Sequence, residues 1–259
     1  MLDPVFSSDK FKNANYEGFC IFSFDWNSGD SANRARSGHY RRYHAEGHAT
    51  CRNITLKGTP PAEIEITPLE DDPTCGPLQK EKPTTHFYVV GPDDGLADVI
   101  VSLKGVTGQS TGASATPAVL DQNGCLYVPQ ILAVQTGQKI VVKNSDPCIH
   151  NVHTTPTVAG NPESNQVQMP GGADLTFTFP QPEMFLRFKC DVHPWMFAWV
   201  SVFDSPYFCV SDKDGKFVIK NVPPGKYTIE AAHRKLGTQT QDVEITDKDV
   251  TANFTFEVK

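Results

Sequence analysis

The sequence predicts an all-β protein built from two β-sandwiches. From about residue 48 onward, short runs rich in Val, Ile, Phe, Tyr and Thr are separated by clusters of Gly, Pro, Asn and Asp, as strands are by turns. No stretch shows the apolar periodicity of a long amphipathic helix. After Ser205-Pro206 the pattern changes character but remains β, which predicts a second, smaller sandwich.

The strands expected in the first sandwich lie between residues 86 and 203. Turn signals such as GPDDG, DQNG and MPGG separate them. In chain order these runs are HFYVVG (86–91), ADVIVSLKG (97–105), KIVVKN (139–144), LTFTF (175–179), MFLRFKC (184–190) and FAWVSVF (197–203). Many short strands at short spacing are typical of a sandwich or barrel.

The second sandwich is predicted from clear alternation of apolar and polar residues. In GKYTIEA, Tyr227, Ile229 and Ala231 share one face, and ANFTFEV near the C-terminus repeats the pattern. So short a segment is marginal as an independent domain, so we expect it to pack on the first. The expected division is an N-terminal extension over 1–47, a first domain over 48–205 and a second over 206–259.

Composition excludes several classes of protein. The chain has 259 residues, 30 acidic against 23 basic ones and a net charge of −7, which argues against a nucleic-acid-binding protein. No run approaches the length of an apolar membrane span. The first residues lack the features of a signal peptide, so we expect either a cytosolic protein or a mature chain. The basic run NRARSGHYRRYHAEGH in the extension is interpreted as a surface arm or as a docking segment.

The segment KCDVHPWM carries three potential metal ligands. Cys190, His193 and Met196 stand between two predicted strands, so a short loop must hold them around one point. A fourth ligand is expected from NSDPCIHNVH, which follows another strand and offers His150 or His153. Two imidazoles, a thiolate and a weak axial thioether are the ligands of a blue-copper electron-transfer site.

These motifs resemble those of the cupredoxins. HNVH followed by C-x2-H-P-x-M, with the short loop of amicyanin, implies that His150, Cys190, His193 and Met196 are the copper ligands and that Asn151 ties the two ligand loops together. The resemblance also implies single-electron transfer, a c-type cytochrome or other redox protein as partner, and a periplasmic or extracellular location. His193 would be the electron port.

A wider resemblance covers residues 48–259. LKGTPP, GLADVIVSL and DGKFVIKNVPPGKYTIEA are similar to segments of methylamine-utilisation-type, plastocyanin-like proteins that end in a carboxypeptidase regulatory-like (transthyretin-like) domain. This implies a cupredoxin Greek-key sandwich followed by a prealbumin-like sandwich.

The chain has seven cysteines, and six can pair if Cys190 binds metal. Such pairing favours an oxidising compartment. The expected pairs are Cys75–Cys125, which flank turn regions, Cys148–Cys209, which would join the two domains, and Cys20–Cys51, which would fix the extension. The alternative is buried thiols.

Other interpretations of these residues remain open. A zinc site would use more Cys or His and little Met, and a dinuclear copper site would need a second loop cysteine. His39, His44 and His48 are expected to be solvated. Pro194 and Trp195 indicate an apolar docking patch around an exposed edge of His193, or ordinary loop packing.

We expect no enzyme activity, because the chain lacks both H-x-H pairs and a zinc-peptidase signature. The alternative to an electron carrier is a structural or interaction subunit, attached to a larger assembly through the arm or the C-terminal domain.

Overall fold

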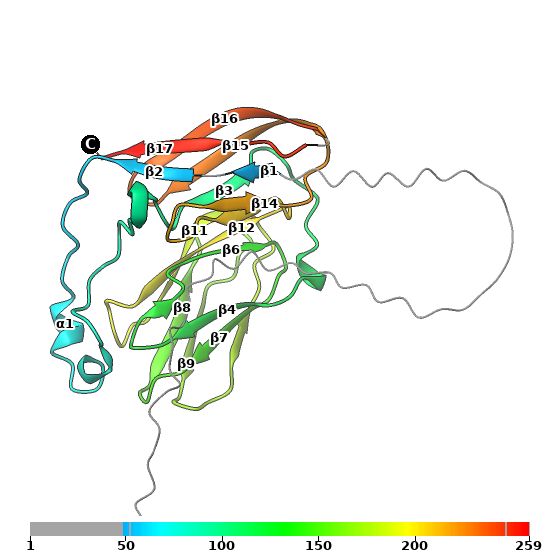
Figure 1. Ribbon diagram of the computed structural model, residues 1–259. Helices are drawn as coiled ribbons and strands as arrows, with labels where there is room; N and C mark the ends of the chain where they lie inside the picture. The colour runs from blue at the N-terminus through cyan, green and yellow to red at the C-terminus, as the bar shows by residue number, and fades with distance from the viewer. Residues whose placement is uncertain (1–48, 52, 247, 259) are drawn as a thin grey trace, which may run out of the picture.

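The structure, a computed structural model, describes residues 49–51, 53–246 and 248–258 (Figure 1). The expected extension over 1–47, with its basic run, its histidines and Cys20, lies outside the described residues. The described chain is almost entirely β, which confirms the predicted class. Its helical pieces are the four-residue α1 (Thr67–Glu70) and three 3-10 turns, η1 (Gly76–Leu78), η2 (Pro92–Asp94) and η3 (Gly112–Ser114).

The first sandwich packs a four-stranded sheet against a five-stranded one. In the four-stranded sheet the order is β10 (Leu175–Phe177), β7 (Ile140–Asn144), β4 (Ala118–Gln122) and β5 (Tyr127–Val128). In the five-stranded sheet the order is β6 (Ile131–Gln135), β12 (Phe197–Phe203), β11 (Glu183–Lys189), β8 (His150–Thr155) and β9 (Ser164–Gln168). Two pairs are parallel, β4 with β7 and β6 with β12.

Alternation along the strands of the first sandwich builds its core. On β11, Leu186 and Phe188 are buried, and on β12, Ala198, Val200 and Val202 are buried. The ring of Phe188 meets the rings of Phe177 and Phe179 edge to face, the arrangement that aromatic pairs favour. The predicted ligands Cys190 and Met196 belong to this same core, at one end of it.

The second sandwich takes strands from both ends of the described chain. Its main sheet has the order β13 (Phe208–Val210), β3 (Ile100–Leu103), β15 (Gly225–His233) and β16 (Gly237–Ile245). Two further pairs are β17 (Asn253–Glu257) with β2 (Asn53–Lys57), which run parallel, and β1 (Ala49–Cys51) with β14 (Phe217–Ile219).

The expected domain boundaries therefore need correction. The sequence predicts residues 49–57 and 100–103 in the first domain, but β1, β2 and β3 pair with strands beyond residue 206. Packing explains the difference, because Phe254 and Phe256 of β17 share a core with Ile54 and Leu56 of β2. The C-terminal segment alone supplies too few apolar faces to close a sandwich.

Residues 58–95 lead from β2 to β3, both in the second sandwich, and pack against the first sandwich on the way. In Figure 1 this segment descends from β2 to α1, beside the first sandwich, and returns toward β3. Leu69 of α1 and Cys75 are fully buried in the core of the first sandwich. A disulfide between Cys75 and Cys125 fastens the segment there, as expected from the sequence.

The two sandwiches also touch through aromatic and cationic side chains. The guanidinium of Arg234, between β15 and β16, lies 3.5 Å from the centre of the Trp199 ring on β12. The rings of Phe203 and Phe208 stack with centroids 4.9 Å apart.

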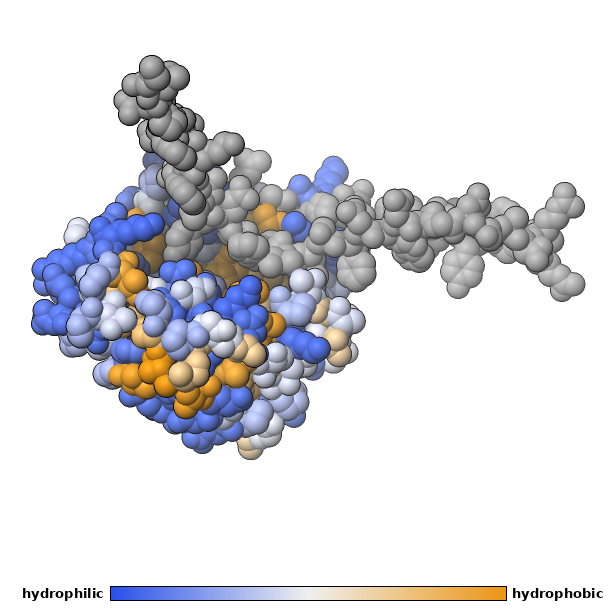
Figure 2. Space-filling model, turned by 90° about the horizontal axis from the view of Figure 1, so that it is seen from below, coloured by the Kyte–Doolittle hydropathy of each residue, from blue (hydrophilic) through white to orange (hydrophobic). Residues whose placement is uncertain are grey.

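On the surface, apolar side chains gather in a patch on the face seen from below (Figure 2). Among the described residues, no helix has the length and apolarity to span a bilayer.

Candidate metal centre

The loop that carries Cys190, His193 and Met196 joins β11 to β12. The strands pair up to Lys189 and Phe197, so the loop between them is short. Its ends are closed by two backbone hydrogen bonds, from Cys190 N to Met196 O (3.1 Å) and from Met196 N to His193 O (2.9 Å). All three predicted ligands are buried, with exposed fractions of 1%, 7% and 0% in chain order. The loop thus fixes the three side chains before any ligand arrives.

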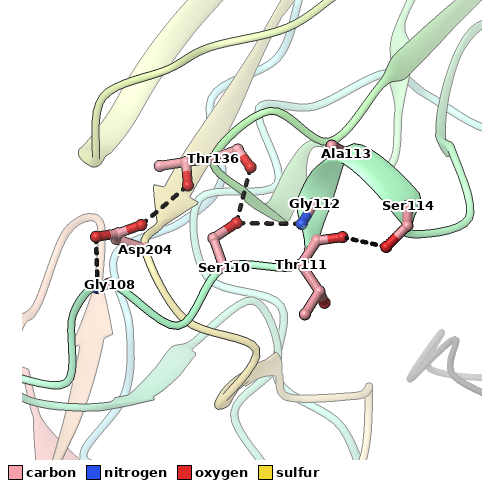
Figure 3. A pocket seen from close by; sticks show the side chains of 8 residues that line it. All are labelled: Gly108, Ser110, Thr111, Gly112, Ala113, Ser114, Thr136 and Asp204. Atoms are coloured by element: carbon pink, nitrogen blue, oxygen red, sulfur yellow. Dashed lines mark hydrogen bonds between the residues drawn. The ribbon is translucent and has the colours of Figure 1, made fainter.

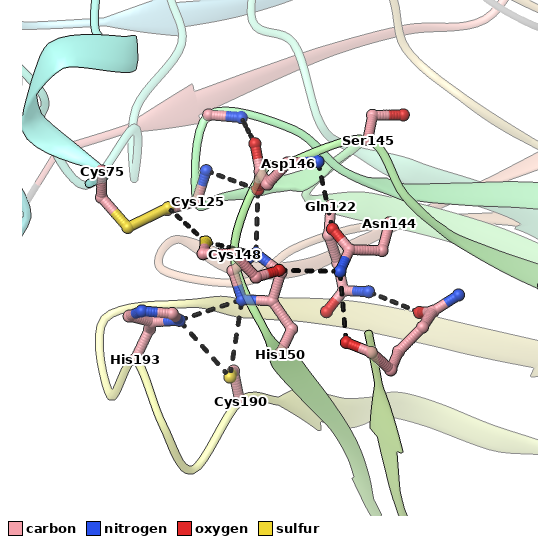
Figure 4. Close-up of polar contacts among 12 residues, drawn as sticks. Cys75, Gln122, Cys125, Asn144, Ser145, Asp146, Cys148, His150, Cys190 and His193 are labelled. Atoms are coloured by element: carbon pink, nitrogen blue, oxygen red, sulfur yellow. Dashed lines mark hydrogen bonds and ion pairs between the residues drawn. A yellow bond between two sulfur atoms is a disulfide. The ribbon is translucent and has the colours of Figure 1, made fainter. Parts of the chain in front are cut away.

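His150, the first residue of β8, completes a convergent set of donor atoms (Figure 4). Its Nδ1 lies 2.9 Å from Nδ1 of His193, and Sγ of Cys190 lies 3.9 Å and 3.8 Å from these two nitrogens. A circle through the three atoms has a radius of about 2.1 Å, which is the length of a metal–imidazole bond and close to that of a metal–thiolate bond. The described residues therefore fit a single ion. Met196 is fully buried in the same loop.

Asp146 is a functional neighbour that the sequence analysis missed. Its carboxylate is buried and accepts hydrogen bonds from Gly124 N (2.6 Å), Cys125 N (2.8 Å) and, through Oδ2, Nε2 of His150 (2.9 Å). A proton held at Nε2 leaves the Nδ1 lone pair of His150 directed toward Cys190 and His193. The signal was present in the sequence, since an acidic residue stands four positions before His150 in NSDPCIH.

The pKa values of His150, His193 and Cys190 are shifted in different directions by their surroundings. Burial alone lowers the pKa of His150, but hydrogen bonds to Asp146 and Cys190 outweigh it and raise the pKa to about 8. Burial and the neighbouring His150 lower the pKa of His193. Burial opposes ionisation of the Cys190 thiol, yet hydrogen bonds from His150 and from the Asn151 backbone bring its pKa below the ordinary value. The pKa values of the two facing imidazoles are thus shifted in opposite directions.

Asn151 links the two ligand loops, as the resemblance implied. Its Oδ1 accepts hydrogen bonds from the backbone N of Asp191 (2.7 Å) and Val192 (3.2 Å), and its own N donates to Cys190 Sγ (3.5 Å). The buried amide thereby holds the loop that carries Cys190 against the start of β8. Because the N–H donates to sulfur, it also favours the thiolate.

His153 points away from the convergent set. Its Nδ1 lies 2.7 Å from Asp191 Oδ2, and its Nε2 lies 3.2 Å from Glu163 Oε1. Of the two histidines that the sequence left as alternatives, His150 is the one that meets Cys190 and His193.

The surroundings of His193 differ from the expectation of an exposed ring edge. The imidazole is buried beside the Cys75–Cys125 disulfide, and its ring centroid lies 5.2 Å from that of Trp195. Trp195 is half-buried and donates from Nε1 to Cys125 O (3.1 Å), whereas Pro194 is exposed. The segment that carries α1 and η1, which sequence reasoning did not place here, covers this imidazole.

One of the expected disulfides is present among the described residues. Cys75–Cys125 is formed, but Cys148–Cys209 is wrong. Cys148 carries a thiol next to His150, while Cys209 is buried on β13 in the core of the second sandwich. The two residues belong to different cores, so a bond between them would require one loop to leave its sandwich. Cys20 and the side chain of Cys51 fall outside the described part of the chain.

A hollow in the surface is formed by segments outside the candidate metal centre (Figure 3). Its polar groups satisfy one another: Asp204 accepts from Gly108 N (2.6 Å) and Thr136 Oγ1 (3.1 Å), and Ser110 Oγ donates to Thr136 O (2.8 Å). These bonds join the start of the first sandwich to the end of β12, so we interpret the hollow as part of the scaffold.

One family model matches the C-terminal part of the chain. Residues 208–258 match a domain family described as BOS complex subunit NOMO1-like, second beta sandwich domain. A search of curated proteins found no match.

Among solved structures, the chain is similar to cupredoxins. One is a mutant of amicyanin in the Cu(I) form, at 20% identity and a TM-score of 0.30, covering 39% of this chain and 97% of that one. A purple cupredoxin from Nitrosopumilus maritimus has 20% identity and a TM-score of 0.28, covering 33% and 98%. The copper-containing nitrite reductase of Thermus scotoductus SA-01 has 19% identity and a TM-score of 0.31, and the match covers 35% of this chain but only 23% of the reductase.

Proposed function

We propose that the first sandwich is a cupredoxin-type domain that binds one copper ion through His150, Cys190, His193 and Met196 and carries single electrons. The observation that supports this most directly is the convergence of two imidazole nitrogens and one thiol sulfur on a common point. A bound copper ion would supply one-electron exchange between its two oxidation states. The protein would have no catalytic reaction of its own.

In this proposal the residues around the site each have a definite task. Asp146 keeps the proton of His150 on Nε2, so that Nδ1 is free as a ligand. The backbone N–H of Asn151 stabilises negative charge on Cys190 Sγ. The β11–β12 loop holds its three ligands in a buried, fixed arrangement, which limits rearrangement when the charge of the site changes.

The partner would be a c-type cytochrome or another redox protein, and the location would be periplasmic or extracellular. The Cys75–Cys125 disulfide supports an oxidising compartment. Electrons would enter beside His193, where Pro194 and Val192 reach the surface and Trp195 lies against the imidazole. Val192 and Ile149, each exposed on a ligand loop, give a partner apolar contacts there.

The test is an absorption spectrum of the full chain titrated with Cu(II). We expect an intense visible thiolate-to-copper band at one equivalent, which disappears in Cys190→Ser. His153→Gln is the matched control, because this histidine lies on the same strand but outside the set, and we expect it to keep the band. Met196→Leu is expected to keep the band and shift the reduction potential. Folded protein without a band would exclude the carrier.

A structural or interaction subunit is the second candidate. It is favoured by the match of residues 208–258 to a domain of a complex subunit and by the covered position of His193. This candidate predicts a folded chain that gives no thiolate-to-copper band in the same titration.

A further inference from the structure

Three sulfur atoms lie together beside His193, next to the proposed copper ligands but not among them (Figure 4). Cys75 and Cys125 form a disulfide, and Cys148 Sγ lies 3.7 Å from Cys125 Sγ. These three sulfurs and one nitrogen of His193 all lie within 4.8 Å of one another. Cys75 and Cys125 are fully buried, and Cys148 is half-buried.

The three cysteines lie on different segments, and a side chain forms a hydrogen bond with the main chain of each. Asp72 Oδ1 accepts a hydrogen bond from Cys75 N (2.8 Å), and Asp146 Oδ2 accepts one from Cys125 N (2.8 Å). Asn144 Nδ2 donates to Cys148 O (3.0 Å). The segment that carries Cys75 is also held beside the loop of Cys125 by a hydrogen bond from Gln79 Nε2 to Gly124 O (2.7 Å) and by the buried side chain of Leu69, so the cluster can stay assembled when the disulfide is opened.

Two acidic side chains adjoin the cluster. Two carboxylates, those of Asp72 and Asp146, stand on the loops that carry the cysteines. If the disulfide is reduced, three thiols meet beside the imidazole of His193. Thiolates in this number are the donors that Zn²⁺ and Cu(I) prefer.

We propose that reduction of Cys75–Cys125 creates a second metal site, in which Cys75, Cys125 and Cys148 bind a thiophilic d10 cation, Zn²⁺ or Cu(I), with His193 as the fourth neighbour. Tetrahedral ligands at a metal–sulfur distance of about 2.3 Å place two sulfurs about 3.8 Å apart. The sulfurs of Cys125 and Cys148 lie at nearly this separation, 3.7 Å. Nδ1 of His193 faces Cys190, which leaves Nε2 of the ring for the second site.

A dithiol can reduce the Cys75–Cys125 disulfide in a balanced exchange reaction. Two electrons from the dithiol break the bond between the two sulfurs, giving two thiols on the protein and a disulfide on the reductant. Binding of the cation then releases thiol protons to solvent, and the metal keeps its oxidation state. The site would thus be closed under oxidising conditions and open under reducing ones.

The experiment uses the full chain carrying Cys190→Ser, so that the copper set is disabled and its failure is separate from failure of this site. One sample keeps its disulfides; the other is reduced with a phosphine and freed of reductant under anaerobic conditions. Both are titrated with Zn²⁺ against a chromophoric chelator, and with Co²⁺ as a probe of sulfur-to-metal charge transfer. We expect the reduced chain to bind one more equivalent than the oxidised chain, with a thiolate band for Co²⁺.

Variants then assign the extra equivalent to these residues. Cys148→Ser and Cys148→Ala, each checked for folding by circular dichroism, are expected to lose it. Ser145→Ala, on the same loop but with its hydroxyl bonded to Asp121, is the matched control and should keep it. The proposal is overturned if reduction adds no equivalent, or if folded Cys148 variants bind it as well as the parent chain, because thiols elsewhere would then be the ligands.

Discussion

Two buried histidines, one in each sandwich, have pKa values that are shifted in opposite directions. His150 has an exposed fraction of 0% and His233, the last residue of β15, one of 3%. His150 contacts Asp146, Cys190 and His193, and its pKa is raised to about 8. Burial lowers the pKa of His233 to about 4.

The partners of each imidazole account for the difference. His233 lies against the rings of Tyr88 and Phe256, and its Nδ1 accepts a hydrogen bond from Lys235 N (3.3 Å), so the neutral form suits its site. His150 has a carboxylate on one nitrogen and a convergent donor set on the other. Burial of a histidine therefore does not by itself indicate a ligand, whereas the polar groups facing its two nitrogens do.

The largest expected effect is a loss of stability in the second sandwich that leaves copper binding by the first unchanged. Phe256→Ala removes a fully buried ring from the second core and is expected to lower the free energy of unfolding by about 3–5 kcal/mol. At temperatures where the variant is folded, one equivalent of copper should still bind, because the donor set lies in the other core. Chemical denaturation and copper titration of the same sample measure both. Loss of copper binding by folded protein would mean that the two cores are coupled.

A pH series tests the neutral state of His233. Its folded pKa lies below the unfolded value, so the unfolded chain binds more protons between pH 6.5 and 4. The contribution of this residue to the free energy of unfolding has its full value above pH 6.5. It falls by about 3 kcal/mol in total as the pH decreases toward 4. His233→Gln should flatten this part of the profile, measured by urea unfolding of the metal-free chain. An unchanged slope in the variant would assign the effect to other groups.

The next prediction concerns the carboxylate that distinguishes His150 from His233. Asp146→Asn removes the charge while keeping the shape, and we expect copper affinity to fall about 10–100-fold, as for other groups that orient metal-binding histidines. Competition with a chelator of known affinity measures the change. Asp121→Asn is the matched control, since Asp121 bonds to Ser145 on the same loop but not to a ligand. Equal losses in both variants would point to loop stability.

The smallest expected effect compares two tyrosines. The hydroxyl of Tyr127 lies 3.4 Å from Asn151 O and Lys189 O, and that of Tyr227 donates to Pro223 O (3.0 Å). Tyr127→Phe and Tyr227→Phe should each cost about 1 kcal/mol or less, because single neutral hydrogen bonds contribute little net stability. Thermal unfolding checks both. A much larger loss in Tyr127→Phe would show that its hydroxyl holds the ligand loops together.

Local features of the sequence predicted which residues of the two candidate ligand loops come together. Cys190 and His193 are held by one turn between adjacent strands, so their spacing already determined that they meet. The roles of Asp146 and Cys148 depend on where neighbouring loops pass, which alternation along a strand does not encode. The domain boundary failed for the same reason, since β2 and β17 pair at a separation of 200 residues.

The pairing of β2 and β17 also bears on how the chain reaches its fold. β3 and β13 are neighbours in one sheet, and the chain between them forms the first sandwich, which is therefore an insertion held by two tethers. During synthesis the inserted sandwich can close as soon as β12 is made, whereas the outer one must wait for its final strand. Contacts this distant in sequence are slow to form. A fragment that begins at residue 206 would be missing three strands of its own sandwich.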